Sequence, residues 1–335
     1  MRGTAQERSS LLEKMERPNA LPFSFDSITT EFGRRPIGFR FANHSINIKA
    51  CLSGNEIVAT GEDSSYDVAE AKAFSELIER SALLSLGQKY GAKSSNGWAA
   101  HPHKSQAETN AIHELVERDA VLSQWYSSTP FLEIDPRSFP YAIQKWATDE
   151  LARSEFPRLV LLLSTKGLGP SVTSLLLNKN GFGVCAHAAR ESLGAAVNAA
   201  ITEVCRAAHG AIRHEYWRDT LKLKSGSRDP IGPNAHALYY AYHVSFPEWI
   251  FGEKIDWEKA DTLWQQRMAI VNAADNQFEL QTVMEFPVHV SFAKHPEAFE
   301  LQWGSTDVEC VARCKGAKRL GLNSKVINKE THIVS

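Results

Sequence analysis

The sequence has few cysteines, no long apolar run and no excess of charge of either sign. Its five cysteines are odd in number and irregularly spaced, so we expect reduced thiols in a cytoplasmic protein rather than a disulfide framework. No apolar run reaches membrane-spanning length, and the polar N-terminus lacks the apolar segment of a signal peptide, so no membrane is indicated. Lysine plus arginine (37) nearly balance aspartate plus glutamate (39), which argues against a nucleic-acid partner.

The chain also lacks the common nucleotide-binding loop. No G-x-x-x-x-G-K-[ST] segment occurs, so any nucleotide site must be of another kind. With 335 residues, 43% of them hydrophobic, the chain can bury a substantial core, and no low-complexity linker divides it. We therefore expect an N-terminal extension over residues 1–37 and a single domain over residues 38–335.

The hydrophobic pattern predicts a mixed α/β (α+β) fold. Alternation over Gly38–Thr60, with a turn at Ser53-Gly54-Asn55, predicts a hairpin. Helical spacing predicts three long helices, the second opened by a Ser105–Glu108 capping box, and the stretch Tyr90–His103 between the first two is expected to be irregular. The long helices are expected over Tyr66–Leu86, Ser105–Trp125 and Arg190–Glu215, shorter helices over Tyr141–Ala152, Pro233–His243 and Trp257–Asn272, and strands over Arg158–Ser164, Ser171–Leu177, Gly181–Ala188, Phe278–Met284 and Val288–Phe292, with a polar tail to Ser335.

Two of the predicted helices repeat one pattern of glutamates. Ser75–Ser85 reads SELIERSALLS and His113–Ser123 reads HELVERDAVLS, so each carries two glutamates three apart followed by an arginine. Residues three apart share a helix face, which makes each glutamate couple a carboxylate pair. The repetition favours a site for a charged ligand. Two amphipathic helices with solvated acidic faces remain the alternative.

The segment after the first pair resembles the signature of a known family. Ser95–Tyr126 reads SNGWAAHPHKSQAETNAIHELVERDAVLSQWY, and it resembles the YcaO family, whose members are ATP-dependent enzymes that activate backbone amides. The glutamate helix before it and the Gly183–Arg206 segment after it are similar to further family motifs. The resemblance spans roughly residues 61–304. It implies a YcaO-type fold, with long helices packed on mixed sheets and a nucleotide site without a P-loop.

The resemblance implies ATP and Mg²⁺ as cofactors. Carboxylates repel phosphates but bind Mg²⁺, a hard cation that in turn binds phosphate oxygens. The expected Mg²⁺ ligands are Glu76, Glu79 and Glu203. The expected nucleotide-binding residues are Arg80, Ser95, Asn96, Gly97, Arg118 and Arg206. Glu114, Glu117 and Asp119 either support these ligands from behind or are structural, and the sequence names no catalytic acid or base.

The chain departs from the family pattern in four ways. Glu62 and Asp63 stand where a Gly-Lys-Gly turn is usual, Ala200 and Arg206 replace a glutamate and a glutamine, Lys294 is the only cation near the place of a late arginine, and the tail has no proline. A lysine and a bidentate arginine are not equivalent for phosphate. A degenerate, non-catalytic subunit that binds a peptide or partner enzyme therefore remains an alternative.

The expected activity is phosphorylation of a backbone amide in a ribosomally synthesised precursor peptide. As a cyclodehydratase the protein would form a thiazoline or oxazoline, and as a thioamide synthetase it would use external sulfide. No leader-recognition module is visible, so a separate leader-binding partner protein is expected. The resemblance also implies an oligomer such as a homodimer.

Overall fold

The computed structural model describes residues 23–33, 44–92, 94–213, 239–242, 244–273, 277–285, 288–302 and 306–333. Most of the predicted N-terminal extension lies outside these residues, as do the first residues of the predicted hairpin. The end of the third predicted helix and most of the helical pattern at Pro233–His243 lie outside them too.

The first sheet is antiparallel and carries α2 on one face. Its strands β1 (Ser27–Gly33), β2 (His44–Leu52) and β3 (Asn55–Asp63) pair in that order, and Ser53-Gly54 turn the chain at positive φ. The predicted hairpin is confirmed in its described part. Helix α2 (Tyr66–Leu86) has the predicted bounds. It approaches β3 so closely that a Cβ at Gly61 would lie 1.7 Å from the carbonyl oxygen of Ala69.

The second sheet packs beside α3. Strands β10 (Glu279–Met284), β11 (His289–Lys294) and β4 (Trp98–His101) are antiparallel, and the rings of Trp98 and Phe292 stack at 4.8 Å. The expectation of an irregular stretch over Tyr90–His103 is wrong for the four residues of β4, Trp98–His101, because β11 gives them a pairing partner far along the chain.

Helix α3 (Lys104–Tyr126) begins earlier than the capping pattern predicted. Its N-cap residue is His103, and no side chain caps the helix, so Ser105 lies inside the first turn. The predicted capping box is therefore wrong. Thirteen of the side chains of α3 are buried, which indicates that packing rather than a cap stabilises this helix.

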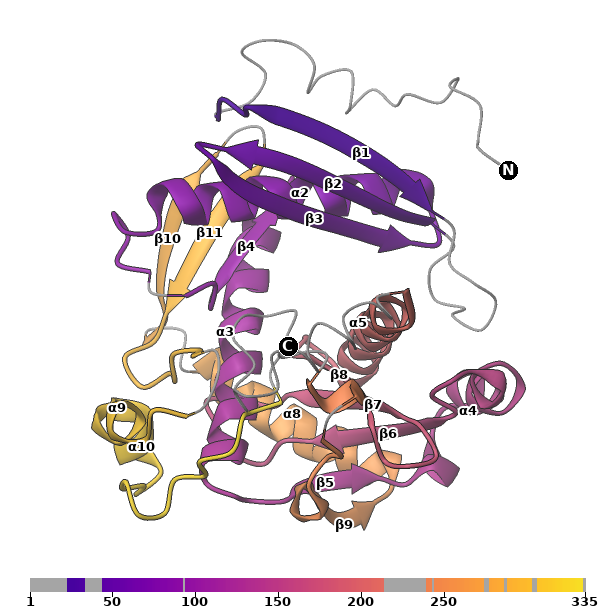
Figure 1. The fold of residues 1–335 in the computed structure, drawn as a ribbon. Coiled ribbons are helices and arrows are strands. Elements are labelled where there is room, and N and C mark those ends of the chain that lie inside the picture. Colours follow the sequence, from indigo (N-terminus) through magenta and orange to yellow (C-terminus); the bar gives the residue numbers. More distant parts are fainter. Residues whose placement is uncertain are drawn as a thin grey trace.

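The third sheet has five strands, in the order β8–β7–β6–β5–β9 (Figure 1). The strands are β5 (Phe131–Ile134), β6 (Arg158–Leu163), β7 (Val172–Leu177), β8 (Gly183–Ala188) and β9 (Phe251–Ile255), and only β5 and β9 are parallel. Helix α5 (Leu193–Arg213) packs on β7 and β8 through its small residues, with Ala196 and Ala200 fully buried. Helices α4 (Tyr141–Asp149) and α8 (Trp257–Ala273) complete this part.

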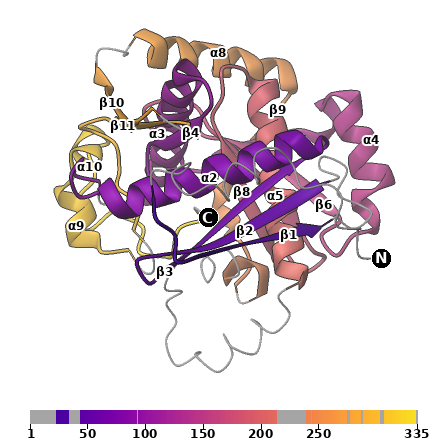
Figure 2. The ribbon, with the colours of Figure 1, turned by 90° about the horizontal axis from the view of Figure 1, so that it is seen from above.

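The layer of α2 and the first sheet lies above α3 and α5 (Figures 1 and 2). This arrangement brings α2, α3 and α5 together, although they are separated by long stretches of sequence. The three helices that carry the candidate glutamates thus lie around the middle of the molecule, each packed on its own sheet (Figure 1).

The C-terminal part is short helices followed by a buried tail. After α9 (Val308–Arg313) and α10 (Lys315–Arg319), Thr331, His332 and Ile333 are buried, and Ile333 is only 1% exposed. The expected polar tail is therefore wrong here. The thiol of Cys185 and the ring of His187 both contact the carbonyl oxygen of Ile333, which explains how β8 holds the tail.

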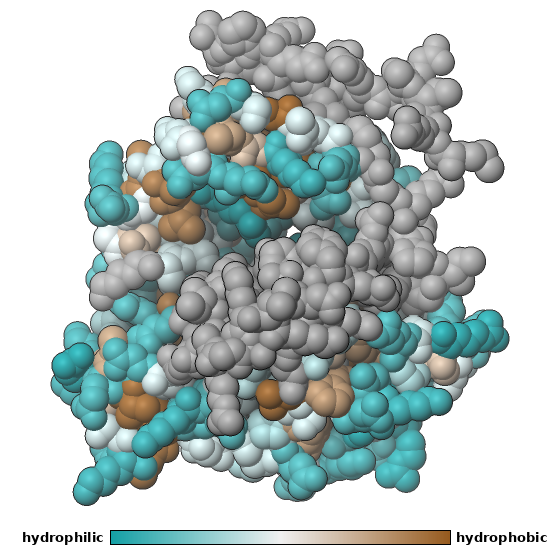
Figure 3. All heavy atoms as spheres, in the orientation of Figure 1, coloured by the Kyte–Doolittle hydropathy of each residue, from teal (hydrophilic) through white to brown (hydrophobic). Residues whose placement is uncertain are grey.

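Among the described residues, no helix combines the length and apolarity needed to cross a membrane. On the face drawn in Figure 3, the apolar residues outside the grey atoms are scattered among hydrophilic ones.

Candidate active site at the junction of three helices

Helix α2 places Glu76 against the edge of the first sheet. The carboxylate accepts the backbone N–H of Thr60 at 2.7 Å and the Arg80 Nη2–H at 2.5 Å. Thr60 lies on β3, an edge strand, so Glu76 satisfies a strand N–H that no neighbouring strand can reach. Glu76 therefore already has a structural function, and Arg80 is committed to it as an ion pair.

Glu79 lies one turn further along α2 and faces inward. Its carboxylate accepts the backbone N–H of Ala100 at 3.2 Å. Burial and the negative charge of Glu76 raise the pKa of Glu79 to about 8, although Arg80 and Arg118 act in the opposite direction. The alternative of a solvated acidic face is therefore wrong for Glu79.

Helix α3 turns its own carboxylate pair toward the same place. Burial, followed by the charge of Glu79, raises the pKa of Glu114 well above its ordinary value. Burial also raises the pKa of Glu117 to about 7, with a further contribution from the charge of Glu203. The backbone of Ala189, the residue after β8, acts in the opposite direction on the pKa of Glu117.

Helix α5 contributes Glu203 and Arg206, which form an ion pair at 2.5 Å and remain about 40% exposed. The charges of Glu203 and Glu76 both raise the pKa of Arg206. Charges on each of the three helices therefore shift the pKa of a group on another of them. The glutamates involved are Glu76, Glu79, Glu114, Glu117 and Glu203, which we call the five-glutamate site.

The five-glutamate site fits a hard cation by its chemistry. Carboxylate oxygens are the ligands that Mg²⁺ prefers. The pKa values of Glu79, Glu114 and Glu117 stay raised although arginines lie near them, so a further positive charge would stabilise their ionised forms. In the part of the chain that the structure describes, no three histidine, cysteine, aspartate or glutamate side chains are grouped closely enough to hold an ion as they stand. Arg80 and Arg206 engage two of the predicted ligands, so binding a cation requires side-chain rearrangement.

The Ser95-Asn96-Gly97 loop has structural reasons for its residue types. Asn96 is buried and donates to the carbonyl oxygen of Phe299 at 3.2 Å. Gly97 has φ of 75°, and a Cβ there would lie 2.3 Å from the carbonyl oxygen of Ala293. These contacts join the loop to β11 and the segment after it, and a nucleotide contact by Ser95, Asn96 or Gly97 stays a prediction.

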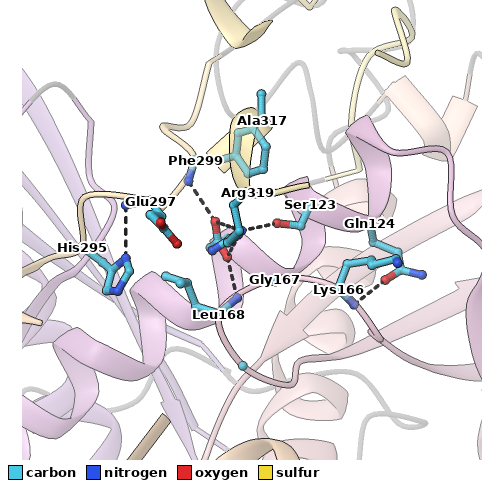
Figure 4. Close-up of polar contacts among 12 residues, drawn as sticks. Ser123, Gln124, Lys166, Gly167, Leu168, His295, Glu297, Phe299, Ala317 and Arg319 are labelled. Atoms are coloured by element: carbon cyan, nitrogen blue, oxygen red, sulfur yellow. Dashed lines mark hydrogen bonds and ion pairs between the residues drawn. The ribbon is translucent and has the colours of Figure 1, made fainter. Parts of the chain in front are cut away.

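Asp119 does not belong to the five-glutamate site and joins a separate network, whose members Leu168, Phe299 and Arg319 are labelled in Figure 4. Its buried carboxylate accepts Arg319 Nη2–H at 2.9 Å and the backbone N–H groups of Leu168 and Phe299. The pKa of Asp119 is raised because burial outweighs the effect of Arg319. These contacts tie α3 to α10 and to the β6–β7 loop, as the structural interpretation of Asp119 expects. Arg118 contacts its neighbour, with Nε 3.9 Å from Glu117 Oε1.

The sequence patterns did not reveal Arg190. It lies between β8 and α5, and its positive charge partly offsets the rise in the pKa values of Glu114 and Glu117. Arg190 belongs to neither copy of the repeated glutamate pattern. Its only signal in the sequence was a cation at the first residue of the third predicted helix, which in the structure begins three residues later, at Leu193.

A family model identifies the class of this protein. The model described as YcaO cyclodehydratase, ATP- and Mg²⁺-binding, matches residues 83–284, more than half of the chain. The chain belongs to the YcaO family. The family resemblance and the family's cofactors, ATP and Mg²⁺, are confirmed. The matched residues include Glu114, Glu117 and Glu203, whereas Glu76 and Glu79 precede them.

Solved structures share the fold at low sequence identity. YcaO from Methanopyrus kandleri, bound with AMPPCP and Mg²⁺, aligns over 81% of this chain and 85% of its own, with a TM-score of 0.55 and 14% identity. A heterocyclase in complex with substrate and cofactor aligns over 91% of this chain and 55% of its own, with a TM-score of 0.61 and 15% identity. This chain therefore spans about half of that heterocyclase.

The E. coli microcin synthetase McbBCD complex with pro-MccB17 bound also aligns with this chain. The match covers 80% of this chain and 91% of the other, with a TM-score of 0.50 and 11% identity. No curated protein matches the chain. The structural matches confirm the predicted fold class.

Proposed function

We propose that this protein uses ATP and Mg²⁺ to activate backbone amides of a ribosomally synthesised precursor peptide. The observation that carries the proposal is the convergence of five glutamates from α2, α3 and α5. Membership of the YcaO family supports the same chemistry. Phosphoryl transfer to an amide oxygen turns that oxygen into a leaving group, which a thiol, a hydroxyl or external sulfide then replaces.

In this proposal the glutamates bind the cation and the arginines bind the phosphates. Glu76, Glu79 and Glu203 are the proposed Mg²⁺ ligands, and Glu114 and Glu117 lie beside them. Mg²⁺, when bound, supplies positive charge that neutralises the phosphates of ATP. Arg80 and Arg206 would exchange carboxylate partners for phosphate oxygens, since a guanidinium binds either one through two parallel hydrogen bonds.

Two structural relatives support peptide and protein partners. One is a heterocyclase in complex with substrate and cofactor, and the other is the McbBCD synthetase complex with pro-MccB17 bound. We propose a precursor peptide as substrate and a separate protein that binds its leader, with an azoline as the first candidate product. The proposal also includes a thioamide as the alternative product and a homodimer as the assembly state of the protein.

A non-catalytic subunit is the second candidate function. It is favoured by the ion pairs of Glu76 with Arg80 and of Glu203 with Arg206, and by Ala200 in place of a carboxylate. In such a subunit these ion pairs would be permanent and would only hold the helices together. Its remaining activity would be docking of a peptide or partner enzyme.

Calorimetry separates the two candidates. We expect MgATP to bind the pure protein, and Glu79→Gln to abolish this binding because it removes a proposed carboxylate ligand of Mg²⁺. Glu253→Gln is the matched control, since Glu253 is exposed and pairs with Lys259 at the surface. If the wild-type protein binds no MgATP, the enzyme proposal is wrong and the second candidate remains.

Mass spectrometry of the modified peptide defines the product. Ring closure onto a cysteine, serine or threonine removes the elements of water from the peptide, whereas thioamide formation replaces oxygen with sulfur. We expect one of these changes, dependent on ATP, when the peptide is incubated with the protein and its partner. An unchanged mass in a complete reaction that consumes ATP would contradict the proposed activity.

A further inference from the structure

The position of Arg190 is fixed by its preceding residue. Arg190 Nη1–H donates to the carbonyl oxygen of Ala189 at 2.6 Å, and Ala189 itself is fully buried. Ala189 directly follows β8, and β8 packs against α3. The β8–α5 connection, which carries Arg190, thus lies beside α3.

The charge of Arg190 acts on the α3 face of the five-glutamate site. Its guanidinium influences His113, Glu114 and Glu117, which lie on adjacent turns of α3. Among the described residues, Arg190 has no carboxylate within ion-pair distance, whereas Arg80, Arg118 and Arg206 each have one. A guanidinium has five N–H donors, so most of the hydrogen-bonding capacity of Arg190 is available to a ligand.

We propose that Arg190 binds the phosphate groups of the nucleotide at the five-glutamate site. This inference rests on the proposed function and adds a residue to it. Phosphates brought beside glutamates by a cation meet negative charge from the protein, and a fixed, uncommitted guanidinium offsets that repulsion. Its planar fork also matches two phosphate oxygens, which a lysine cannot do.

Two variants and two ligands test the role of Arg190. Binding of MgATP is measured by calorimetry, and binding of Mn²⁺ alone by electron paramagnetic resonance. For Arg190→Gln we expect MgATP affinity to fall roughly 10- to 100-fold, since charge-assisted hydrogen bonds are lost. Mn²⁺ affinity should stay the same or increase, because a positive charge beside the carboxylates has been removed. Arg190→Lys should lie between wild type and Arg190→Gln for MgATP.

The control is Arg137→Gln, because Arg137 is largely exposed and paired with Asp135 away from the glutamates. A merely structural Arg190 would make Arg190→Gln lose MgATP and Mn²⁺ affinity in parallel, which would overturn the inference. Unchanged MgATP binding in both variants would overturn it while leaving the proposed function intact. Absence of MgATP binding to the wild-type protein would overturn both. If Arg190→Gln fails to fold, Arg190→Lys decides by the same comparison.

Discussion

At the scale of single residues, charge burial governs both the candidate site and the stability of the protein. Glu79 is half-buried and lies close to other carboxylates, so its charge is costly when no cation is bound. We therefore expect Glu79→Gln to change the free energy of unfolding by less than about 1 kcal/mol, or to increase it. Chemical denaturation without divalent cations measures this. A loss comparable to that of a core truncation would show that the carboxylate is needed for folding.

The Asp119–Arg319 pair should behave in the opposite way. Arg319→Ala leaves a buried carboxylate without its cation, and breaking such a pair costs about 3–5 kcal/mol. Arg313→Ala is the control, because Arg313 lies exposed on the neighbouring helix α9. Urea denaturation of both variants measures the difference. Equal stabilities would contradict a structural role for the network in Figure 4.

His187 should make the fold sensitive to acid. Burial lowers its pKa to about 3, while Thr173 Oγ1 and the carbonyl oxygen of Ile333 hold its two ring nitrogens. Between the ordinary pKa near 6.5 and the folded value, the unfolded state binds the proton and the folded state does not. Stability is therefore present above about pH 6.5 and decreases as the pH falls, by up to about 3 kcal/mol near pH 4.

Comparison with His187→Gln isolates this contribution. The variant keeps an amide that can hydrogen-bond but cannot titrate, so its stability should fall less steeply between pH 6.5 and 4. His113, whose pKa burial lowers to about 4, contributes equally to both proteins. Parallel pH profiles for the two proteins would exclude His187 as a source of the acid sensitivity.

At the scale of helices and strands, the close approach of α2 to β3 sets the position of Glu76. A Cβ at Gly61 would meet the backbone of Ala69 and Ala73, and backbone cannot move aside as a side chain can. We expect Gly61→Ala to destabilise the protein by about 1–3 kcal/mol and to weaken MgATP binding, since Glu76 would move with α2. Gly194→Ala, with open space around its Cβ, is the control. Thermal unfolding and calorimetry measure both effects.

Long periodic elements were predictable from the sequence, whereas short and paired ones were not. Helix α2 keeps its apolar spacing over 21 residues, and its predicted bounds are confirmed. Strands β4, β5 and β9 have four or five residues each, too few to show alternation, and they exist because distant strands pair with them. The tail is rich in polar residues, and its burial was not predictable because it depends on contacts with β8, more than a hundred residues away.

The residues of the candidate site likewise divide into those predictable from local sequence spacing and those placed by long-range packing. The repeated glutamate pattern revealed Glu76, Glu79, Glu114 and Glu117, because spacing of three along a helix is local information. The ion pair of Asp119 with Arg319 and the placement of Arg190 depend on how separate segments pack. Neither contact produces a pattern in one sequence.

At the scale of the whole molecule, three layers of structure serve to bring α2, α3 and α5 together. Each helix packs on a different sheet (Figures 1 and 2), and the charges of their glutamates influence groups on the other helices. The proposed function depends on this convergence rather than on any single glutamate. The site should therefore take up a divalent cation and the nucleotide as one unit.

The most direct measurement is a crystal structure with Mn²⁺ and a non-hydrolysable ATP analogue, using anomalous scattering to locate the metal. We predict a manganese peak bound by carboxylates of both α2 and α5, with Arg80 and Arg206 turned from their glutamates toward the phosphates. A nucleotide bound elsewhere, or a metal without contact to these helices, would contradict the account.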